Sequence, residues 1–192
     1  ALSLNSNSVP AIVLRAKRLV DDRLFESAVQ VLDRALGINP RDRVALSHRA
    51  TVAHLLHDDA GAKRFRERAM AKRPGYAEID RIFGDHLSAL YRFKDSVPYF
   101  RAALQRQPDY VAAMHGLAKA LVYLGKGKEA VGLWTKAQDL EKGYAETGRY
   151  NILLSERRLA KDYDLVESDH FLFMVHKSDR AVLERYLTKW YE

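Results

Sequence analysis

Apolar and small residues recur along the chain at helical spacing, and the pattern repeats. Pro40, Pro74 and Pro108 follow one another at intervals of 34 residues. Placing each proline at position 32 of a 34-residue unit predicts four consecutive units, and a repeat of this length is typical of stacked helix pairs. The units begin at Val9, Arg43, Ala77 and Val111 and together cover residues 9–144.

Five positions of the unit hold residues of similar size in the four copies. Small residues occupy position 8 (Ala16, Ala50, Gly84, Ala118), position 20 (Ala28, Ala62, Ser96, Ala130) and position 27 (Ala35, Ala69, Ala103, Ala137). Mostly large residues occupy position 11 (Leu19, Ala53, Leu87, Leu121) and position 24 (Leu32, Arg66, Phe100, Trp134). Small residues let two helices cross closely and large ones fill the space between neighbouring units. Each unit is therefore predicted to be a helix-turn-helix whose second helix ends before the proline.

Turn signals separate the two predicted helices within a unit. They are Asp21 and Asp22 in the first unit, residues 57–59 in the second, and residues 125–127 in the fourth. Pro98 interrupts the second helix of the third unit. With Asp95 as the N-cap, Pro98 would fall in the first helical turn, where proline is tolerated.

These columns resemble the tetratricopeptide repeat (TPR), and the resemblance covers residues 9–144. It implies an all-α fold, a right-handed α-solenoid of four helix-turn-helix units with a capping helix. The units would be 9–42, 43–76, 77–110 and 111–144, after a lead of residues 1–8 that is disordered or foreign to the natural chain. The chain departs from the family pattern at four places, namely Arg15 and Arg49 at position 7, Arg66 at position 24 and Asp80 at position 4.

By resemblance, positions 2, 5, 9 and 12 of the first helices line a concave groove that binds a peptide or protein partner. The groove residues expected here are Val13, Lys17, Ser47, Thr51, His54, Arg81, Asp85, His115 and Lys119. The family's two-carboxylate clamp for chaperone tails needs lysine at position 5 and asparagine at position 9 of one unit. Val13 and Lys17 stand at those positions in the first unit, so the clamp is not reproduced.

The composition adds little chemistry to this picture. The chain has 32 basic and 25 acidic residues, and six of the basic ones lie within residues 61–74. A solvated helix face is the simpler interpretation of that stretch, and an acidic or polyanionic partner is the alternative. There is no cysteine, and none of the HExxH, GxSxG, GxGxxG and P-loop motifs occurs. No enzyme activity, cofactor or metal is predicted; His54 and His57 lack a third ligand, and His48, His86 and His115 are interpreted as surface or groove residues.

The remaining chain does not follow the repeat. Residues 145–162 are predicted to form a capping helix, and residues 163–192 a β-α fragment of a further domain. In the strand, Phe171, Phe173 and Val175 would share one face, and His170, Leu172, Met174 and His176 the other. A lone strand needs a partner for its backbone, so the fragment looks like a unit cut short.

The tail also resembles the start of the peptidase-MA-like (gluzincin) zinc metallopeptidase domain. The matching residues are Asn151, Leu153 and Leu154, then Val166, Glu167, Ser168, His170 and Phe171, and then Leu183, Glu184, Tyr186 and Leu187. The family's HExxH helix would lie beyond Glu192, so no catalytic role passes to any residue here.

Three functions are compatible with the sequence. The first is a non-catalytic protein–protein interaction scaffold, the repeat arm of a larger and metallopeptidase-like bacterial protein. The second is a self-contained adaptor that forms a homodimer through residues 163–192, and the third, weaker one is a polyanion- or RNA-binding solenoid. No segment of the chain is apolar and long enough to span a membrane. Both a cytoplasmic and a cell-envelope location stay open, the latter because the resembling family includes exported proteins.

Overall fold

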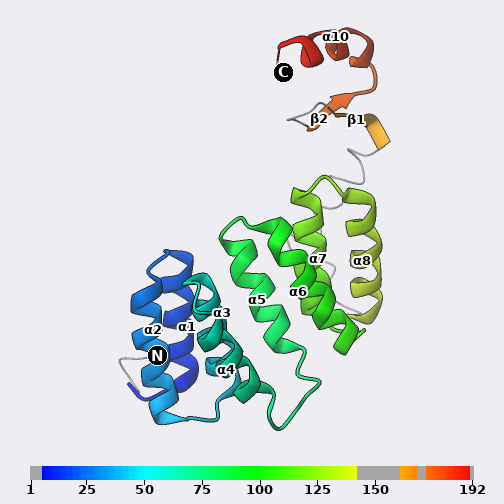
Figure 1. Ribbon diagram of the computed structural model, residues 1–192. Coiled ribbons are helices and arrows are strands. Elements are labelled where there is room, and N and C mark those ends of the chain that lie inside the picture. Colours follow the sequence, from blue (N-terminus) through cyan, green and yellow to red (C-terminus); the bar gives the residue numbers. More distant parts are fainter. Residues whose placement is uncertain (1–5, 142–160, 168–171, 191–192) are drawn as a thin grey trace.

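Eight helices of the N-terminal part form four antiparallel pairs that stack side by side in the computed structural model (Figure 1). The structure describes residues 6–141, 161–167 and 172–190. The pairs are α1 (Val9–Asp21) with α2 (Phe25–Ile38), α3 (Arg43–Leu55) with α4 (Asp59–Met70), α5 (Glu78–Ala89) with α6 (Phe93–Arg106), and α7 (Val111–Tyr123) with α8 (Gly127–Leu140). The predicted all-α solenoid of helix-turn-helix units is thus confirmed.

The small-residue columns work as the sequence predicts, and Phe100 shows how. Its ring is fully buried and lies against Gly84 of α5 and Gly116 of α7. A Cβ atom would approach ring carbons to 2.7 Å at Gly84 and to 2.3 Å at Gly116, closer than real Cβ contacts. The aromatic residue of position 24 therefore fills a space that exists only because these two glycines carry no side chain.

The turn between the two helices of each unit contains one residue in the left-handed region. These residues are Arg23, His57, Tyr91 and Gly125, with φ of 61°, 61°, 62° and 72°. All four stand at position 15 of the unit. The next amide then bonds back to a carbonyl five residues earlier, as Leu24 N does to Leu19 O at 2.8 Å.

A basic side chain closes the turn that joins one unit to the previous one. The guanidinium of Arg34 donates to Ser6 O (2.7 Å), that of Arg68 to Pro40 O (3.1 Å) and the Lys136 ammonium to Pro108 O (3.2 Å). Each bond spans 28 residues, so it recurs with the repeat. Alanine fills this position in the third unit, and Arg106 instead donates to Pro74 O at 2.8 Å.

Two departures from the repeat pattern compensate each other. Asp80 is only 1 % exposed, and its carboxylate accepts hydrogen bonds from Arg66 of α4 and from Arg106 of α6. The Arg106 Nε atom lies 2.8 Å from Oδ2. A carboxylate buried in place of an apolar residue is tolerated because two cations pair with it.

The predicted start of α6 is wrong. The helix begins at Phe93 with Arg92 as the N-cap residue, and Asp95 lies within the first turn. Pro98 is therefore the sixth residue of the helix and lies inside it. Its ring is exposed, so solvent can reach the carbonyl that would have accepted the missing N–H bond.

The C-terminal residues form a small unit of their own. Strand β1 (Tyr163–Glu167) pairs antiparallel with β2 (Leu172–His176), and α10 (Arg180–Trp190) follows and contacts β2. The expectation of a strand without a partner is thus wrong, because residues 163–167 supply one. Val175 is buried and Phe173 half-buried, on the face predicted for them.

Several predictions for the tail lie outside the described residues. They include most of the predicted capping helix 145–162, of which only Lys161 and Asp162 are described, both helical. They also include His170 and Phe171 of the predicted strand. On α10, Val182 is 61 % exposed and Tyr186 57 %, so this end of the unit presents apolar side chains to solvent.

Candidate binding surface

The concave face closes around α3 in the first three units. Helices α1, α3 and α5 contact one another, and α3 is buried on nearly every side. Ser47 and Thr51 are fully buried, and their hydroxyls donate to Arg43 O (2.7 Å) and Ser47 O (2.9 Å). Val13 is 7 % exposed and belongs to the apolar core. These three predicted groove residues do not line an accessible surface, because small side chains on α3 let its neighbours close over it.

Two histidines meet inside this closed region. His48 Nδ1 and His86 Nε2 lie 2.7 Å apart, and both side chains are buried. Burial, with the nearby charges of Lys17 and Arg81, lowers the pKa of His48 from 6.5 to about 3. Burial also lowers the pKa of His86 well below its ordinary value. The expectation that His48 and His86 are surface or groove residues is wrong; they are a neutral pair that links α3 to α5.

The accessible part of the concave face begins at Arg81 of α5. Its guanidinium binds Glu78 through Nη2 (2.5 Å to Oε1), pairs with Asp85, and donates from Nε to the Tyr110 hydroxyl at 2.9 Å. Arg81 and Asp85 are both predicted groove residues, and the structure places them in direct contact. Sequence reasoning misses Glu78 and Tyr110, although Glu78 occupies position 2 of its unit, one of the groove positions.

Helix α7 continues this surface. His115 Nδ1 accepts a hydrogen bond from Trp134 Nε1 at 2.6 Å, and its Nε2 lies 4.0 Å from a Glu141 carboxylate oxygen. Lys119 is exposed. The structure brings Arg81, Asp85, His115 and Lys119 onto the adjacent helices α5 and α7, which pack against each other.

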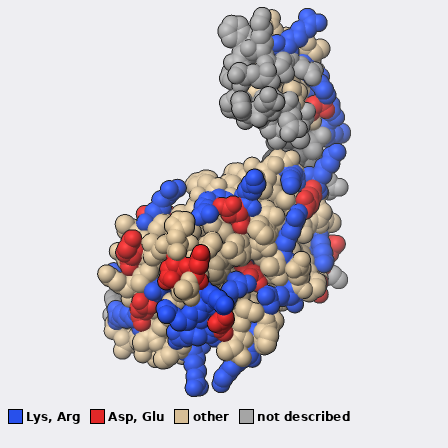
Figure 2. All heavy atoms as spheres, in the orientation of Figure 1, with Lys and Arg blue, Asp and Glu red and all other residues tan. Residues whose placement is uncertain are grey.

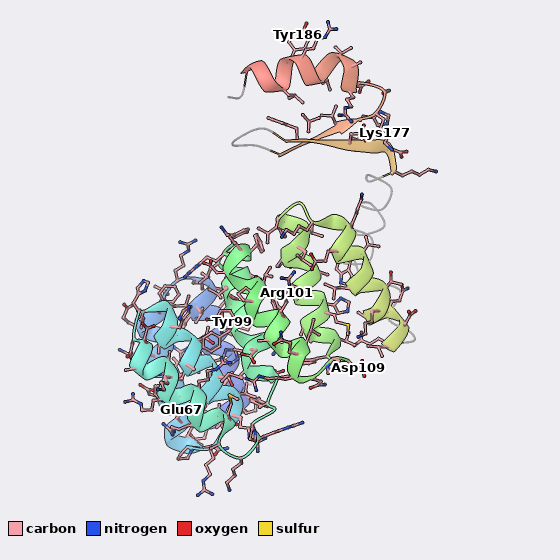
Figure 3. All side chains as sticks on the ribbon, turned by 45° about the vertical axis from the view of Figure 1, so that its right-hand side comes forward. Glu67, Tyr99, Arg101, Asp109, Lys177 and Tyr186 are labelled. Carbon is pink, nitrogen blue, oxygen red and sulfur yellow. The ribbon has the colours of Figure 1, made fainter. Side chains whose placement is uncertain are left out.

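The other two predicted groove residues lie on α1 and α3, outside α5 and α7. Lys17 is exposed on α1. His54 is half-buried against the rings of Phe83 and Tyr99, with centroid distances of 5.9 and 6.2 Å. Tyr99 comes from α6 (Figure 3), so His54 packs at the boundary between the second and third units.

A pocket opens beside Arg81 where two inter-unit loops meet. Its volume is about 260 Å³. It is lined by Arg73, Tyr76, Ala77, Glu78, Gln107 and Tyr110. The second loop is the one that carries Asp109 in Figure 3. Burial raises the pKa of Tyr76, with a further contribution from Glu78, so its phenol stays protonated at neutral pH.

The basic stretch 61–74 has structural uses. Arg66 pairs with Asp80, and Arg68 donates to the Pro40 carbonyl. The guanidiniums of Arg64 and Arg68 also lie 5.0 and 5.5 Å from the ring centroid of Phe65. Figure 2 shows Lys and Arg side chains interspersed with Asp and Glu on the visible face of the repeats. Several arginines of this stretch therefore make contacts within the fold, and two of them pack against the buried Phe65 ring.

Two kinds of site are absent from the residues that the structure describes. No group of three or more His, Cys, Asp or Glu side chains there is close enough to hold a metal ion. Within the same residues no helix is long and apolar enough to cross a membrane.

Stacked helix pairs with an accessible concave face define a helical-repeat scaffold, and solved structures identify which kind. TTC0263, a thermophilic TPR protein of Thermus thermophilus, superposes with a TM-score of 0.51 at 20% identity, covering 80% of this chain and 86% of that chain. PilF of Pseudomonas aeruginosa superposes at 0.48 (18% identity, 79% and 70% covered), and YrrB, "a TPR protein with an unusual peptide-binding site", at 0.44 (18% identity, 82% and 78% covered). The likeness to TTC0263 shows that the chain has the TPR fold. No family model and no curated protein matches the sequence.

Proposed function

We propose that this protein is a non-catalytic protein–protein interaction scaffold that binds a peptide or protein segment on the concave face of α5 and α7. One observation carries the proposal: the accessible groove residues Arg81, Asp85, His115 and Lys119 gather on these two helices, whereas α3 is closed over. A partner that follows the concave face would find most of the predicted polar groups there, with Lys17 on α1 as a further exposed one.

The side chains of this surface are held in place before a partner arrives. Three neighbours hold the Arg81 guanidinium, and the Trp134 indole fixes His115 as an acceptor at Nδ1. Groups ordered in advance lose little conformational entropy on binding, so more of the contact energy contributes to affinity. The mixture of charges favours a polar peptide that carries both signs.

A displayed library of random peptides, selected on the full chain, tests the proposal. We expect Lys119→Glu and Asp85→Asn to weaken the selected peptides by about tenfold or more, the loss of one charge-assisted contact. Lys63→Glu on α4 is the matched control, since Lys63 is also exposed but lies on a second helix. Selected peptides that are indifferent to both concave substitutions would contradict the proposal. A single-stranded RNA oligomer that binds only at low salt, and is lost in Lys63→Glu, would favour the polyanion alternative instead.

For the C-terminal unit we propose the opening of a further, peptidase-MA-like domain. The strand–strand–helix order and the exposed Val182, Leu183 and Tyr186 of α10 support it, because such a helix face usually packs against another element. Reading the gene beyond the codon for Glu192 tests it: an HExxH helix downstream would support the proposal, and a stop codon would oppose it. The homodimer alternative predicts instead that light scattering of the 192-residue chain gives twice the monomer mass.

A further inference from the structure

We infer that the pocket between the two inter-unit loops binds a carboxylate of the partner and so anchors the peptide beside Arg81. The inference rests on the proposed scaffold function and names the chemistry of one end of the partner. The site uses loop residues and position 2 of the third unit, not the groove positions 5 and 9 on which the sequence comparison drew.

Several residues that line this pocket carry hydrogen-bond donors that are not used within the described residues. Among the described residues, the guanidinium of Arg73 has no ion pair and the hydroxyl of Tyr76 has no hydrogen bond. The Tyr110 oxygen already accepts from Arg81 Nε, so its own proton is left to donate to another group. The Gln107 amide adds a further donor. Three or four donors among the lining residues of one pocket suit a ligand rich in hydrogen-bond acceptors.

The charges around the pocket favour a monoanion. Glu78 is the one acidic side chain of the lining, and the Arg81 guanidinium binds both of its oxygens, at 2.5 and 3.0 Å. The same guanidinium also pairs with Asp85, and Arg73 is the one basic side chain of the lining itself. A single guanidinium pairs well with a planar carboxylate, whereas a phosphate dianion would leave one charge uncompensated.

The geometry is set before binding. The Arg43 guanidinium lies 5.8 Å from the centroid of the Tyr76 ring, and Arg81 fixes the Tyr110 hydroxyl. The volume of about 260 Å³ is below the roughly 300–1,000 Å³ typical of pockets that take a whole small molecule. The pocket therefore suits one residue of a peptide, either its C-terminal carboxylate or the side chain of aspartate or glutamate.

Amide NMR shifts of the full chain, titrated with four small probes, test this inference. N-acetylglycine offers a terminal carboxylate, N-acetylaspartic acid α-amide a side-chain carboxylate, N-acetylglycinamide no charge, and inorganic phosphate a mono- and dianion. We expect at least one carboxylate probe to shift amide resonances within residues 73–78 and 107–110. Comparing the two carboxylate probes then shows whether the pocket takes a terminal or a side-chain carboxylate. Arg73→Gln should weaken that probe by about tenfold, the loss of a charge-assisted pair, and Tyr110→Phe by a smaller factor.

Lys72→Gln is the matched control, because it removes the same charge from the neighbouring exposed residue. It should leave the affinity of the carboxylate probe nearly unchanged. The inference would be overturned if N-acetylglycinamide gave the same shifts as the carboxylate probes, or if phosphate bound more tightly than they do. It would also be overturned if Arg73→Gln and Lys72→Gln weakened the carboxylate probe equally, or if neither carboxylate probe caused a shift. If library peptides bind through Lys119 yet ignore Arg73→Gln, only this inference fails; if the pocket takes a carboxylate but no peptide is ever selected, the scaffold proposal fails instead.

Discussion

Replacing Asp80 by asparagine should destabilise the repeat more than any surface charge change. The Asp80 side chain is 1 % exposed and accepts from Arg66 and Arg106, which are 29 % and 32 % exposed. Asparagine is nearly isosteric but neutral, and its NH₂ group would face a guanidinium. The substitution therefore removes the charge of the buried partner while leaving both arginines in place.

The size of the loss follows from the contacts. A hydrogen bond to a charged group contributes about 1.5–3 kcal/mol net, so two such bonds contribute about 3–6 kcal/mol. Both arginines are about a third exposed and can regain water, which reduces the loss. We expect the free energy of unfolding to fall by about 3 kcal/mol, at the lower end of the values of about 3–5 kcal/mol seen when one partner of a buried pair is removed.

Urea denaturation followed by far-ultraviolet circular dichroism measures this change. The Arg101–Glu129 pair provides the control, since it is short (2.7 Å) but its side chains are 50 % and 45 % exposed. Glu129→Gln should cost under about 1 kcal/mol. If Asp80→Asn lowers the free energy of unfolding no more than Glu129→Gln does, the argument that burial makes the Asp80 ion pairs important is refuted.

A compensated variant separates pairing from burial. Arg66→Phe with Asp80→Leu returns an aromatic residue to position 24 and an apolar one to position 4. Replacing a buried ion pair by well-packed apolar residues is often neutral, so the double variant should be more stable than Asp80→Leu alone. If the stability loss of the double variant equals the sum of the losses in Arg66→Phe and Asp80→Leu, the two residues are not energetically coupled.

Three further predictions concern single positions. Gly116→Ala should destabilise the fold by about 1–3 kcal/mol, because its Cβ would lie 2.3 Å from the buried Phe100 ring. Gly132→Ala is the control in the same urea assay: its Cβ would have nothing within 4 Å, so it should stabilise α8 by up to about 1 kcal/mol. Pro98→Ala should raise the thermal midpoint, since it restores an N–H inside α6 worth about 1–3 kcal/mol. His48 is neutral when folded (pKa about 3 against 6.5 unfolded), so as pH falls between these values the unfolded state takes up a proton that the folded state does not. Stability should decline by about 1.4 kcal/mol per pH unit from this group, and His48→Gln should flatten the measured pH profile; parallel profiles would show that it does not titrate this way.

The sequence predicted most reliably the features that depend on local spacing along the chain, above all the helix pairs. Prolines 34 residues apart and small residues at fixed positions specify helix pairs without knowledge of long-range contacts. The same periodicity holds further signals. Arg34, Arg68 and Lys136 share position 26, and this column could have predicted the bonds to the inter-unit carbonyls. In the structure all four second helices begin at position 17, so the repeat also holds for α6 despite Pro98.

The features that the sequence did not predict are contacts between helices or loops of different units. Nothing within α3 indicates that His48 will face His86, because the pairing requires α1 and α5 to close over the same helix. The unusual Arg66 and Asp80 read as two separate departures until α4 and α5 are placed together. The pocket escaped for the same reason, since its two loops lie about one unit apart in sequence.

For the scaffold function proposed above, the closure around α3 limits where a partner can lie. Glu78, Arg81 and Asp85 lie three, four and seven residues apart, so they form a stripe along one face of α5 that starts at the pocket. Seven residues of helix rise about 10 Å, a length that about three residues of extended peptide span. A partner anchored in the pocket would therefore reach past Asp85 within a few residues and meet Lys119 on α7. Since Ser47 and Thr51 on α3 offer no surface, the proposed scaffold would draw most of its specificity from a short segment that lies on α5 and α7.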